Sequence, residues 1–212
     1  GLVSGILPME DGRAINGRME KIKEYYDLGV RAISLTWNGI NCLGYPNSED
    51  PAIMNRGLTD FGKEAVASMQ QLGILVDVAD LCKKPFIATH SNARALAPHR
   101  RNLTDDQLKA LAKAGGVTGL NVFASFLNKD PTDNHSSVDA MVRHVRYIAD
   151  LAGTDTLAMG SDFDGVFGTQ EVEDVTQLYK LIDGLKKASF TEAQIDKFLY
   201  GNVLRVMDEC LK

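Results

Sequence analysis

Six short apolar runs, separated by longer amphipathic segments, constrain the fold of this 212-residue chain more than any other feature. Their composition is typical of buried β-strands, and we predict strands at residues 2–9, 30–37, 74–78, 85–89, 117–123 and 156–160. In segments such as NGRMEKIKEYYDLG and SVDAMVRHVRYIADLAG, apolar residues recur at helical spacing and a glycine closes the end. Strands that alternate with helices indicate a parallel sheet, because a parallel neighbour can be reached only through a crossover.

Two α/β architectures satisfy this pattern, an open doubly wound sheet and a closed (β/α)8 barrel, also called a TIM barrel. No strand is followed by a glycine-rich phosphate loop of the form GxGxxG or GxxxxGK[ST], and these loops are the usual signatures of the doubly wound fold. The pattern therefore favours a TIM barrel, and we predict that residues 1–212 form a single barrel domain. Two helix starts are predicted as capping boxes, Thr104 with Gln107 and Thr191 with Gln194.

Two features do not fit a complete barrel. A barrel has eight strands, whereas six are predicted. The predicted strands 74–78 and 85–89 are separated by only six residues, and a helical crossover needs about a dozen. We therefore expect that the first one or two β/α units of the natural protein lie before Gly1, and that further residues belong near positions 79–80.

Composition excludes some classes of partner. The net charge is −5, and no apolar run approaches the length of a membrane span, which needs about 18 residues. Neither the acidic balance nor the distribution of Lys and Arg favours nucleic acid. The three cysteines are isolated, so a disulfide framework is not expected and a reducing compartment is favoured. We predict a bacterial cytoplasmic protein without nucleic-acid or membrane partners.

Polar side chains stand at the ends of several predicted strands. In a barrel, the carboxyl ends of the strands face the active site. The residues at these positions are Glu10, Trp37, Asn38, Asp77, His90, Asn121 and Asp162. Histidine together with carboxylates is a common ligand set for Zn²⁺ in hydrolases. A carboxylate can also bridge two metal ions about 3.5–4 Å apart, which then activate one water together.

Each of these residues also has a simpler interpretation. His90 could be a hydrogen-bonded core residue, and Glu10 could form an ion pair or cap a helix. Asp162, in the motif GSDFDG, could form an Asx-turn and nothing more. The motif does not match a calcium-binding loop, since the spacing of an EF-hand is not met.

The remaining candidates are basic. The segment HRRN, residues 99–102, could be a solvated turn, or it could provide a guanidinium fork for the carboxylate of a substrate. His135 lies in a polar loop and His144 on a helix beside Arg143, and we expect both histidines at the surface.

Taken together, several segments resemble the membrane (renal) dipeptidase family of zinc peptidases. They are MEDG, GVRAISLTWN, GLTDFGKEAVASMQQLGILVDV, PFIATHSNARAL, HRRNLTDDQLKALAKAGGVTGLNVF and IADLAGTDTLAMGSDFDG. The likeness covers nearly the whole chain. It implies a TIM barrel of the metallo-dependent hydrolase type, with two Zn²⁺ ions per chain, that hydrolyses dipeptides as its small-molecule substrates. It also implies tolerance of a D-residue at the C-terminal position and a possible homodimer.

The resemblance assigns a role to four residues. Glu10 matches the glutamate that bridges the two zinc ions, and His90 matches a histidine ligand of the second zinc. Arg101 matches the arginine that binds the terminal carboxylate of the substrate. Asp162 matches the aspartate beside the metal-bound water.

The sequence departs from the family pattern in three places. The His-x-Asp pair that binds the first zinc has no counterpart and would fall before Gly1. The second histidine of the zinc held by His90 belongs near residues 79–80, where the chain reads VDVADLCKK. Trp37 stands where animal members have a histidine that polarises the substrate.

Three hypotheses about function follow. The first is a zinc-dependent dipeptidase. The second is another amidohydrolase-type activity on the same barrel, because fold does not fix substrate. The third is a non-catalytic binding protein, which would apply if the missing metal ligands were absent from the full protein.

Overall fold

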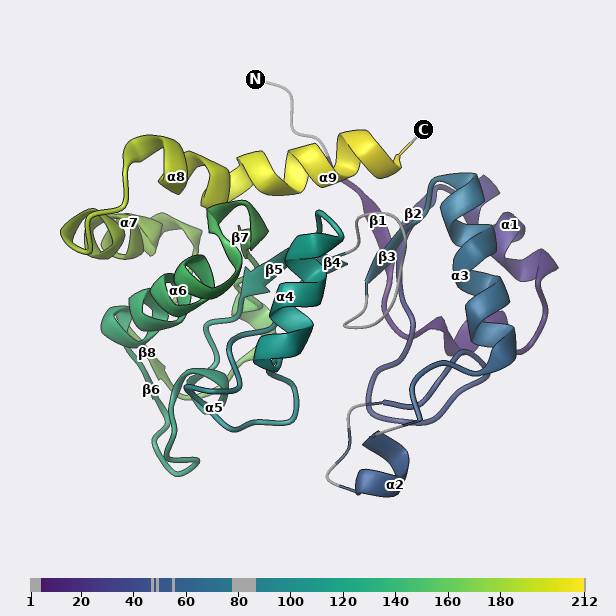
Figure 1. Cartoon of the computed structure of the whole chain (residues 1–212), viewed down its shortest axis with the longest axis horizontal. Helices are drawn as coiled ribbons and strands as arrows, with labels where there is room; N and C mark the ends of the chain where they lie inside the picture. The colour runs from purple at the N-terminus through teal and green to yellow at the C-terminus, as the bar shows by residue number, and fades with distance from the viewer. Residues whose placement is uncertain (1–4, 47, 49, 55, 78–86, 212) are drawn as a thin grey trace. The chain divides into compact units, whose positions relative to one another are not determined.

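The computed structural model describes residues 5–46, 48, 50–54, 56–77 and 87–211 (Figure 1). The chain divides into two compact units. The first comprises the residues up to 87 together with those from 207, and the second comprises residues 88–206. Each unit is built from parallel strands connected by helices, and each is described by itself.

In the first unit, parallel strands are joined by helical crossovers. Strand β2 pairs with both β1 and β3 in parallel, and Asp77 of β3 pairs with Ile87 at the start of β4. The elements in chain order are β1 (Leu7–Met9), the 3-10 helix η1 (Gly12–Ile15), α1 (Glu20–Asp27), β2 (Val30–Ser34), α2 (Pro51–Met54), α3 (Asp60–Leu72), β3 (Leu75–Asp77) and β4 (Ile87–Ala88).

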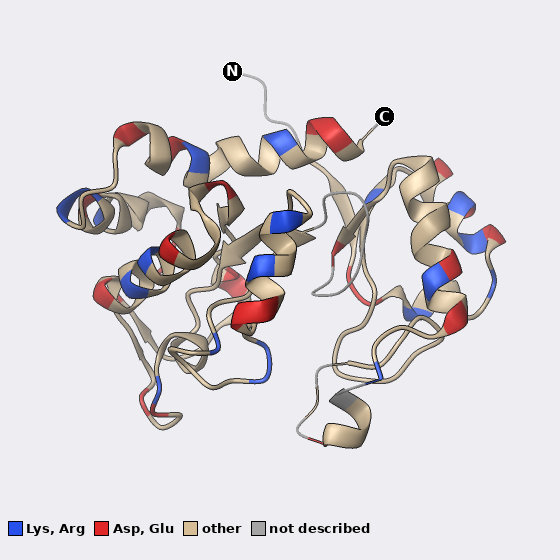
Figure 2. Ribbon diagram, in the orientation of Figure 1, with Lys and Arg blue, Asp and Glu red and all other residues tan. Residues whose placement is uncertain are grey.

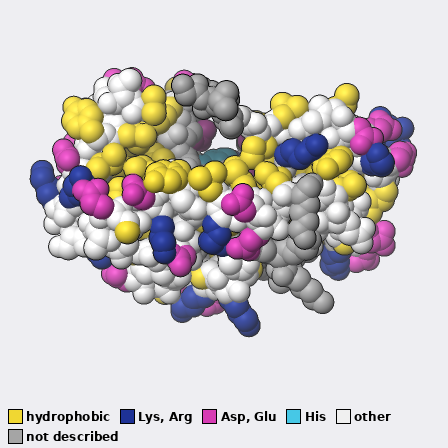
Figure 3. Space-filling view, turned by 90° about the horizontal axis from the view of Figure 1, so that it is seen from above, with side chains coloured by type: hydrophobic (Ala, Val, Ile, Leu, Met, Phe, Trp, Pro, Cys, Tyr) yellow, Lys and Arg dark blue, Asp and Glu magenta, His cyan; other side chains and the backbone are white. Residues whose placement is uncertain are grey.

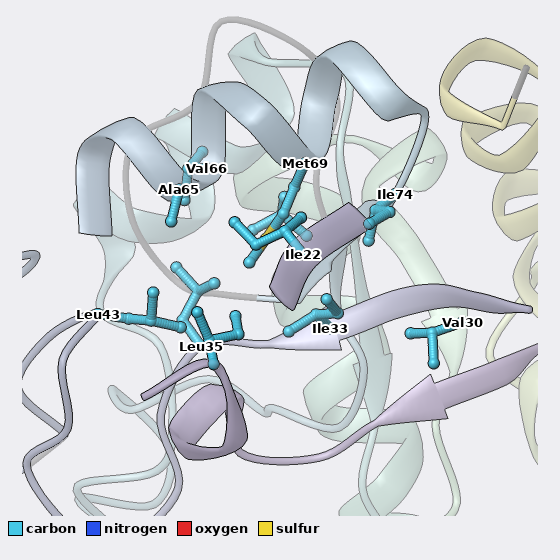
Figure 4. Packing of buried hydrophobic residues seen from close by; sticks show 11 residues of the cluster. Ile22, Val30, Ile33, Leu35, Leu43, Ala65, Val66, Met69 and Ile74 are labelled. Atoms are coloured by element: carbon cyan, nitrogen blue, oxygen red, sulfur yellow. The ribbon is translucent and has the colours of Figure 1, made fainter. Parts of the chain in front are cut away.

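The core of this unit lies between the sheet and helices α1 and α3 (Figure 4). Ile22 of α1, Ile33 of β2 and Met69 of α3 are fully buried within it. Helix α3 begins at Thr59, whose hydroxyl accepts a hydrogen bond from the Gly62 N–H at 2.9 Å. Its apolar residues recur at helical spacing, so one face packs on the strands.

The second unit contains the parallel strand pair β5 and β7, in which Thr118 is opposite Leu157 and Leu120 is opposite Met159. Helices α4 and α6 pack against each other beside these strands (Figure 1). The elements are α4 (Asp105–Lys113), β5 (Val117–Leu120), α5 (Ala124–Leu127), β6 (His135–Ser136), α6 (Val138–Ala152), η2 (Thr154–Thr156), β7 (Leu157–Met159), η3 (Phe163–Gly165), β8 (Thr169–Gln170), η4 (Val175–Gln177), α7 (Leu178–Lys187), α8 (Glu192–Asp196), the π-helix η5 (Lys197–Gly201) and α9 (Asn202–Cys210).

All six predicted strands are present, with narrower bounds, and both predicted capping boxes are confirmed. Residues 2–4, 78 and 85–86 of the predicted strands, and the predicted gap near 79–80, lie outside the described residues. The strand predicted at 117–123 ends at Leu120, because the Asn121 side chain accepts a hydrogen bond from the Phe123 N–H and turns the chain. The short parallel pair β6 and β8 was not predicted, since its four residues carry no apolar alternation.

The surface is mixed in character. Acidic and basic side chains are interspersed on the helices of both units (Figure 2). Apolar side chains gather on the face seen in Figure 3. Among the exposed ones are Tyr200 of η5 and Leu204 of α9, which are 53% and 52% exposed. Within the described part of the chain, no helix combines the length and the hydropathy that a bilayer crossing requires.

Candidate active site

Three strand ends of the second unit meet at the backbone of Thr89. Its carbonyl oxygen would lie 2.0 Å from a Cβ atom added at Gly119 of β5, and 1.9 Å from one added at Gly160, which follows β7. Only glycine at both positions permits this approach. The Ser91 N–H donates to the Gly119 carbonyl at 2.8 Å. The segments that follow β4, β5 and β7 therefore begin close to one another.

His90, one residue beyond this junction, has a defined tautomer. Its Nε2 lies 2.9 Å from Arg101 Nη2, and its Nδ1 lies 2.7 Å from Thr89 Oγ1. Because a guanidinium can only donate, Nε2 must be the acceptor and Nδ1 carries the proton that faces the threonine hydroxyl. The lone pair of His90 Nε2 thus faces the Arg101 guanidinium, and a metal ion bound at this nitrogen would replace that contact.

Arg101 is carried by a loop that is held at several points. Arg94 donates to the Asn102 carbonyl at 2.8 Å and to the Arg100 carbonyl at 2.7 Å, so it bridges the loop from inside. The Arg101 N–H donates to His99 Nδ1 at 3.2 Å. In Figure 2 this basic segment directly precedes the acidic first turn of α4. HRRN is therefore a structured loop and not a loosely solvated turn.

Asp162 does not cap the short helix η3 that follows it. The residue is exposed and adopts a left-handed backbone, with φ 64° and ψ 32°, and its side chain makes no capping hydrogen bond. Instead, Oδ2 accepts a hydrogen bond of 3.0 Å from Asn121 Nδ2. The other oxygen, Oδ1, lies 2.5 Å from where a Cβ atom would stand on Gly165. The carboxylate is thus oriented toward the end of β5.

Three asparagines in this region are fully buried, namely Asn92, Asn102 and Asn121. Asn121 was predicted at a strand end without a role, and Asn92 and Asn102 were not predicted as part of the site. Only Asn121 carried a signal in the sequence, because it stands between the apolar residues Leu120 and Val122. The hydrogen bonds of these asparagines connect the end of β5 with the loop that carries Arg101.

His144 is also buried, so the prediction that it lies at the surface was wrong. Its Nδ1 accepts from the Ala93 N–H at 3.2 Å, and its Nε2 lies 3.1 Å from the Leu127 carbonyl, which can only accept. Burial lowers the pKa of the imidazole to about 4, so it is neutral. The missed signal was helical spacing, because His144 shares the buried face of α6 with Met141 and Ile148.

In the first unit, Glu10 is exposed directly after β1. The residue that caps η1 is Asp11 and not Glu10. Asp11 has a positive φ of 64°, its N–H donates to Ser34 Oγ at 2.9 Å, and its Oδ1 accepts from Asn41 Nδ2 at 2.9 Å. The strand end that carries Glu10 is therefore fixed to the end of β2. Trp37, beyond that strand, is 53% exposed.

Among the described residues, His90 has donor chemistry that suits a metal ion. A hydrogen bond at Nδ1 fixes its ring, as in known metal-binding histidines, and its Nε2 accepts from Arg101. No group of three or more His, Cys, Asp or Glu side chains within the described ranges is placed to hold a metal ion. A full ligand set therefore needs more than the described residues of either unit.

A histidine beside a guanidinium, together with an oriented carboxylate, near the ends of parallel strands is typical of a barrel enzyme. The chain belongs to the membrane dipeptidase family (peptidase family M19), whose sequence model matches residues 1–211. This is a family of metallopeptidases. The family resemblance seen in the sequence is thus confirmed.

Three similar proteins illustrate the relationship. An uncharacterized protein of Klebsiella pneumoniae is 35% identical over 94% of this chain and 79% of its own length. The crystal structure of the metallopeptidase dipeptidase AC is 31% identical, with a TM-score of 0.89, over 99% of this chain and 67% of that one. A metallopeptidase from Rhodobacter sphaeroides, crystallised with a phosphinate mimic of the dipeptide L-Ala-D-Ala, is 31% identical, with a TM-score of 0.87, over 99% of this chain and 64% of that one.

These comparisons confirm the predicted fold class, the TIM barrel of metallo-dependent hydrolases. The chain spans about two thirds of the length of the solved relatives. The strands and helices described above belong to the part of the barrel that this chain covers.

We expect His144 to make stability depend on pH. Its pKa is about 4 in the folded chain and 6.5 in the unfolded one, so between these values the unfolded state binds more protons. The free energy of unfolding should fall by roughly 3 kcal/mol as the pH drops through this window. Chemical denaturation of His144→Gln, which cannot titrate, should show a smaller fall. His135→Gln, at an exposed site, should behave as the wild type, and identical pH slopes for all three proteins would contradict the assignment.

Proposed function

We propose that the protein is a zinc-dependent dipeptidase. The contact between Arg101 and His90 is the observation that carries this proposal, because it puts a carboxylate-binding group 2.9 Å from a nitrogen suited to a metal ion. In a dipeptide, only three covalent bonds separate the scissile carbonyl carbon from the terminal carboxylate carbon. Two such groups side by side therefore suit a very short peptide. The dipeptide mimic bound to the Rhodobacter sphaeroides relative supports the same substrate class.

Two zinc ions are proposed as cofactors, with Glu10 as the bridging carboxylate and His90 as a ligand of one ion. When bound, such ions supply an activated water and polarise the substrate carbonyl. Within the described ranges, no group of three or more His, Cys, Asp or Glu side chains is assembled around these two residues. The proposal is supported by the tautomer of His90 and by membership of a metallopeptidase family.

Arg101 is proposed to bind the terminal carboxylate of the substrate. A guanidinium can form two parallel hydrogen bonds with a carboxylate, which orients the substrate as well as attracting it. The loop contacts made by Arg94 and His99 hold the backbone at Arg101 before substrate arrives, so less conformational entropy is lost on binding.

Asp162 is proposed to accept the proton of the attacking water and to pass it to the leaving amine. A carboxylate is a suitable general base when one oxygen is fixed and the other can reach the proton. The Asn121 hydrogen bond fixes Oδ2, which leaves Oδ1 for this role.

Metal content and substrate range together test the proposal against its alternatives. About two zinc ions per chain and hydrolysis of L-Ala-D-Ala by the purified protein would support it. Hydrolysis of N-acyl amino acids in preference to dipeptides would indicate another amidohydrolase-type activity. A protein that binds the phosphinate mimic but hydrolyses neither class after zinc addition would be a binding protein.

We expect His90→Ala to lose bound zinc, because the substitution removes a ligand nitrogen and leaves the core intact. Metal content measured by mass spectrometry should fall, while the melting temperature of the metal-free protein should stay close to wild type. His135→Ala removes an exposed imidazole elsewhere and is the matched control. A His90→Ala protein with full zinc content would refute the ligand assignment.

For Arg101→Lys, we expect a strong rise in KM for free dipeptides and little effect on C-terminally amidated ones. An ammonium cannot reproduce the two parallel hydrogen bonds of a guanidinium. Arg100→Lys, one position earlier on the same loop, should leave both KM values unchanged. Equal losses on free and amidated substrates would remove Arg101 from carboxylate recognition.

Asp162→Asn should lower kcat by about 10²–10⁴-fold, the usual worth of general acid–base catalysis, with KM little changed. Asparagine keeps the size and the acceptor for Asn121 but cannot take up a proton. Asp164→Asn, two residues on in the same motif, is the control and should retain full turnover. Normal kcat in Asp162→Asn would show that the carboxylate serves only the turn.

A further inference from the structure

Asn121 is held so that its amide group can face only Asp162. The side chain is fully buried at the end of β5, and its Oδ1 accepts a hydrogen bond of 2.7 Å from the Phe123 N–H. Rotating the amide by half a turn would place its NH₂ group against that N–H donor. Nδ2 therefore points to Asp162 Oδ2, at 3.0 Å.

Asp162 needs such a partner. It is exposed, its backbone is left-handed, and its side chain does not bond to the turn that it opens. A carboxylate in this setting would otherwise sample several rotamers. The hydrogen bond from Asn121 selects one rotamer of this carboxylate.

Asn121 is in turn fixed by the other two buried asparagines. Its N–H donates to Asn92 Oδ1 at 2.9 Å, and the Asn92 N–H donates to Asn102 Oδ1 at 3.2 Å. The Nδ2 groups of Asn92 and Asn102 both donate to the Phe126 carbonyl, at 3.1 and 2.9 Å. Asn102 directly follows Arg101 in the chain, so the network reaches the carboxylate-binding loop.

We propose that Asn121 is the positioning residue of Asp162, and that Asn92 and Asn102 tie it to the loop that carries Arg101. This inference rests on the proposed dipeptidase function, in which Arg101 binds the substrate carboxylate and Asp162 accepts the proton. The buried network then fixes the spacing between these two groups. A fixed spacing admits substrates in which the scissile bond lies one residue from the carboxylate.

Asn121→Ser separates the positioning role from the structural one. A serine hydroxyl can still accept from the Phe123 N–H, as in an ST-turn, but it is too short to reach Asp162. With L-Ala-D-Ala and the zinc-loaded protein, kcat should fall by about 10- to 100-fold, the worth of a hydrogen bond to a charged group, with KM little changed. Asn121→Thr fills more of the vacated volume and should give the same kinetic result if the serine variant does not fold.

Asn202→Ser provides the matched control. Asn202 is 2% exposed, and its amide donates to the Thr154 and Leu157 carbonyls, each at 2.8 Å. This substitution removes equivalent buried hydrogen bonds without touching Asp162. We expect a loss of thermal stability like that of Asn121→Ser, with kcat unchanged.

The double variant Asn121→Ser with Asp162→Asn decides the outcome. If Asn121 acts through Asp162, the serine substitution should cost no further activity once Asp162 is replaced. A further loss of the same size in that background, or normal kcat in Asn121→Ser beside an inactive Asp162→Asn, would overturn the inference and leave the proposed function standing. Normal kcat in Asp162→Asn would instead refute the catalytic role on which the inference rests.

Discussion

The approach of the Thr89 carbonyl to Gly119 and Gly160 is the constraint on which the rest of the candidate site depends. A methyl group at either glycine would meet this oxygen at about half the normal contact distance. His90 follows Thr89 directly, Asn121 follows Gly119 by two residues, and Asp162 follows Gly160 by two. Because glycine has no side chain, these two positions allow the segments that carry His90, Asn121 and Asp162 to begin close together at the edge of the sheet. With larger residues at positions 119 and 160, these strand ends would have to lie farther apart.

Hydrogen bonds of buried polar side chains stabilise the segments that meet at the Thr89 carbonyl. Asn92, Asn102, Asn121 and His144 are all fully buried. Their polar side-chain atoms are paired with backbone groups, except that Asn121 Nδ2 donates to the Asp162 carboxylate. Burying such groups unpaired would cost about 1–3 kcal/mol each. Because breaking these hydrogen bonds would leave buried polar groups unsatisfied, the network favours this conformation of the Arg101 loop. The price is a region that tolerates few substitutions.

The sequence predicted those parts of the fold that local patterns determine. Apolar runs identified the six strands, and Thr-x-x-Gln spacing identified two helix starts, because both signals are contained within a few residues. The burial of His144 and the asparagine network were not predicted, since they depend on partners up to 51 positions away in the chain. His90 and Asp162 were found as candidates from their place after strands, and Arg101 from the basic segment HRRN; the family resemblance assigned their roles. The contacts of His90 with Arg101 and of Asp162 with Asn121 became visible only in the structure.

Two acidic residues stand where the chain leaves a strand in a conformation that few residues adopt. Asp11, directly after Glu10, and Asp162 both have φ near 64°. Aspartate tolerates a positive φ better than most residues, yet each such position still costs of the order of 1 kcal/mol. The cost is offset where the side chain is held, by Asn41 at Asp11 and by Asn121 at Asp162. A buried or half-buried asparagine thus accompanies each turn. The hydrogen bond that offsets the strain of the positive φ also orients the carboxylate.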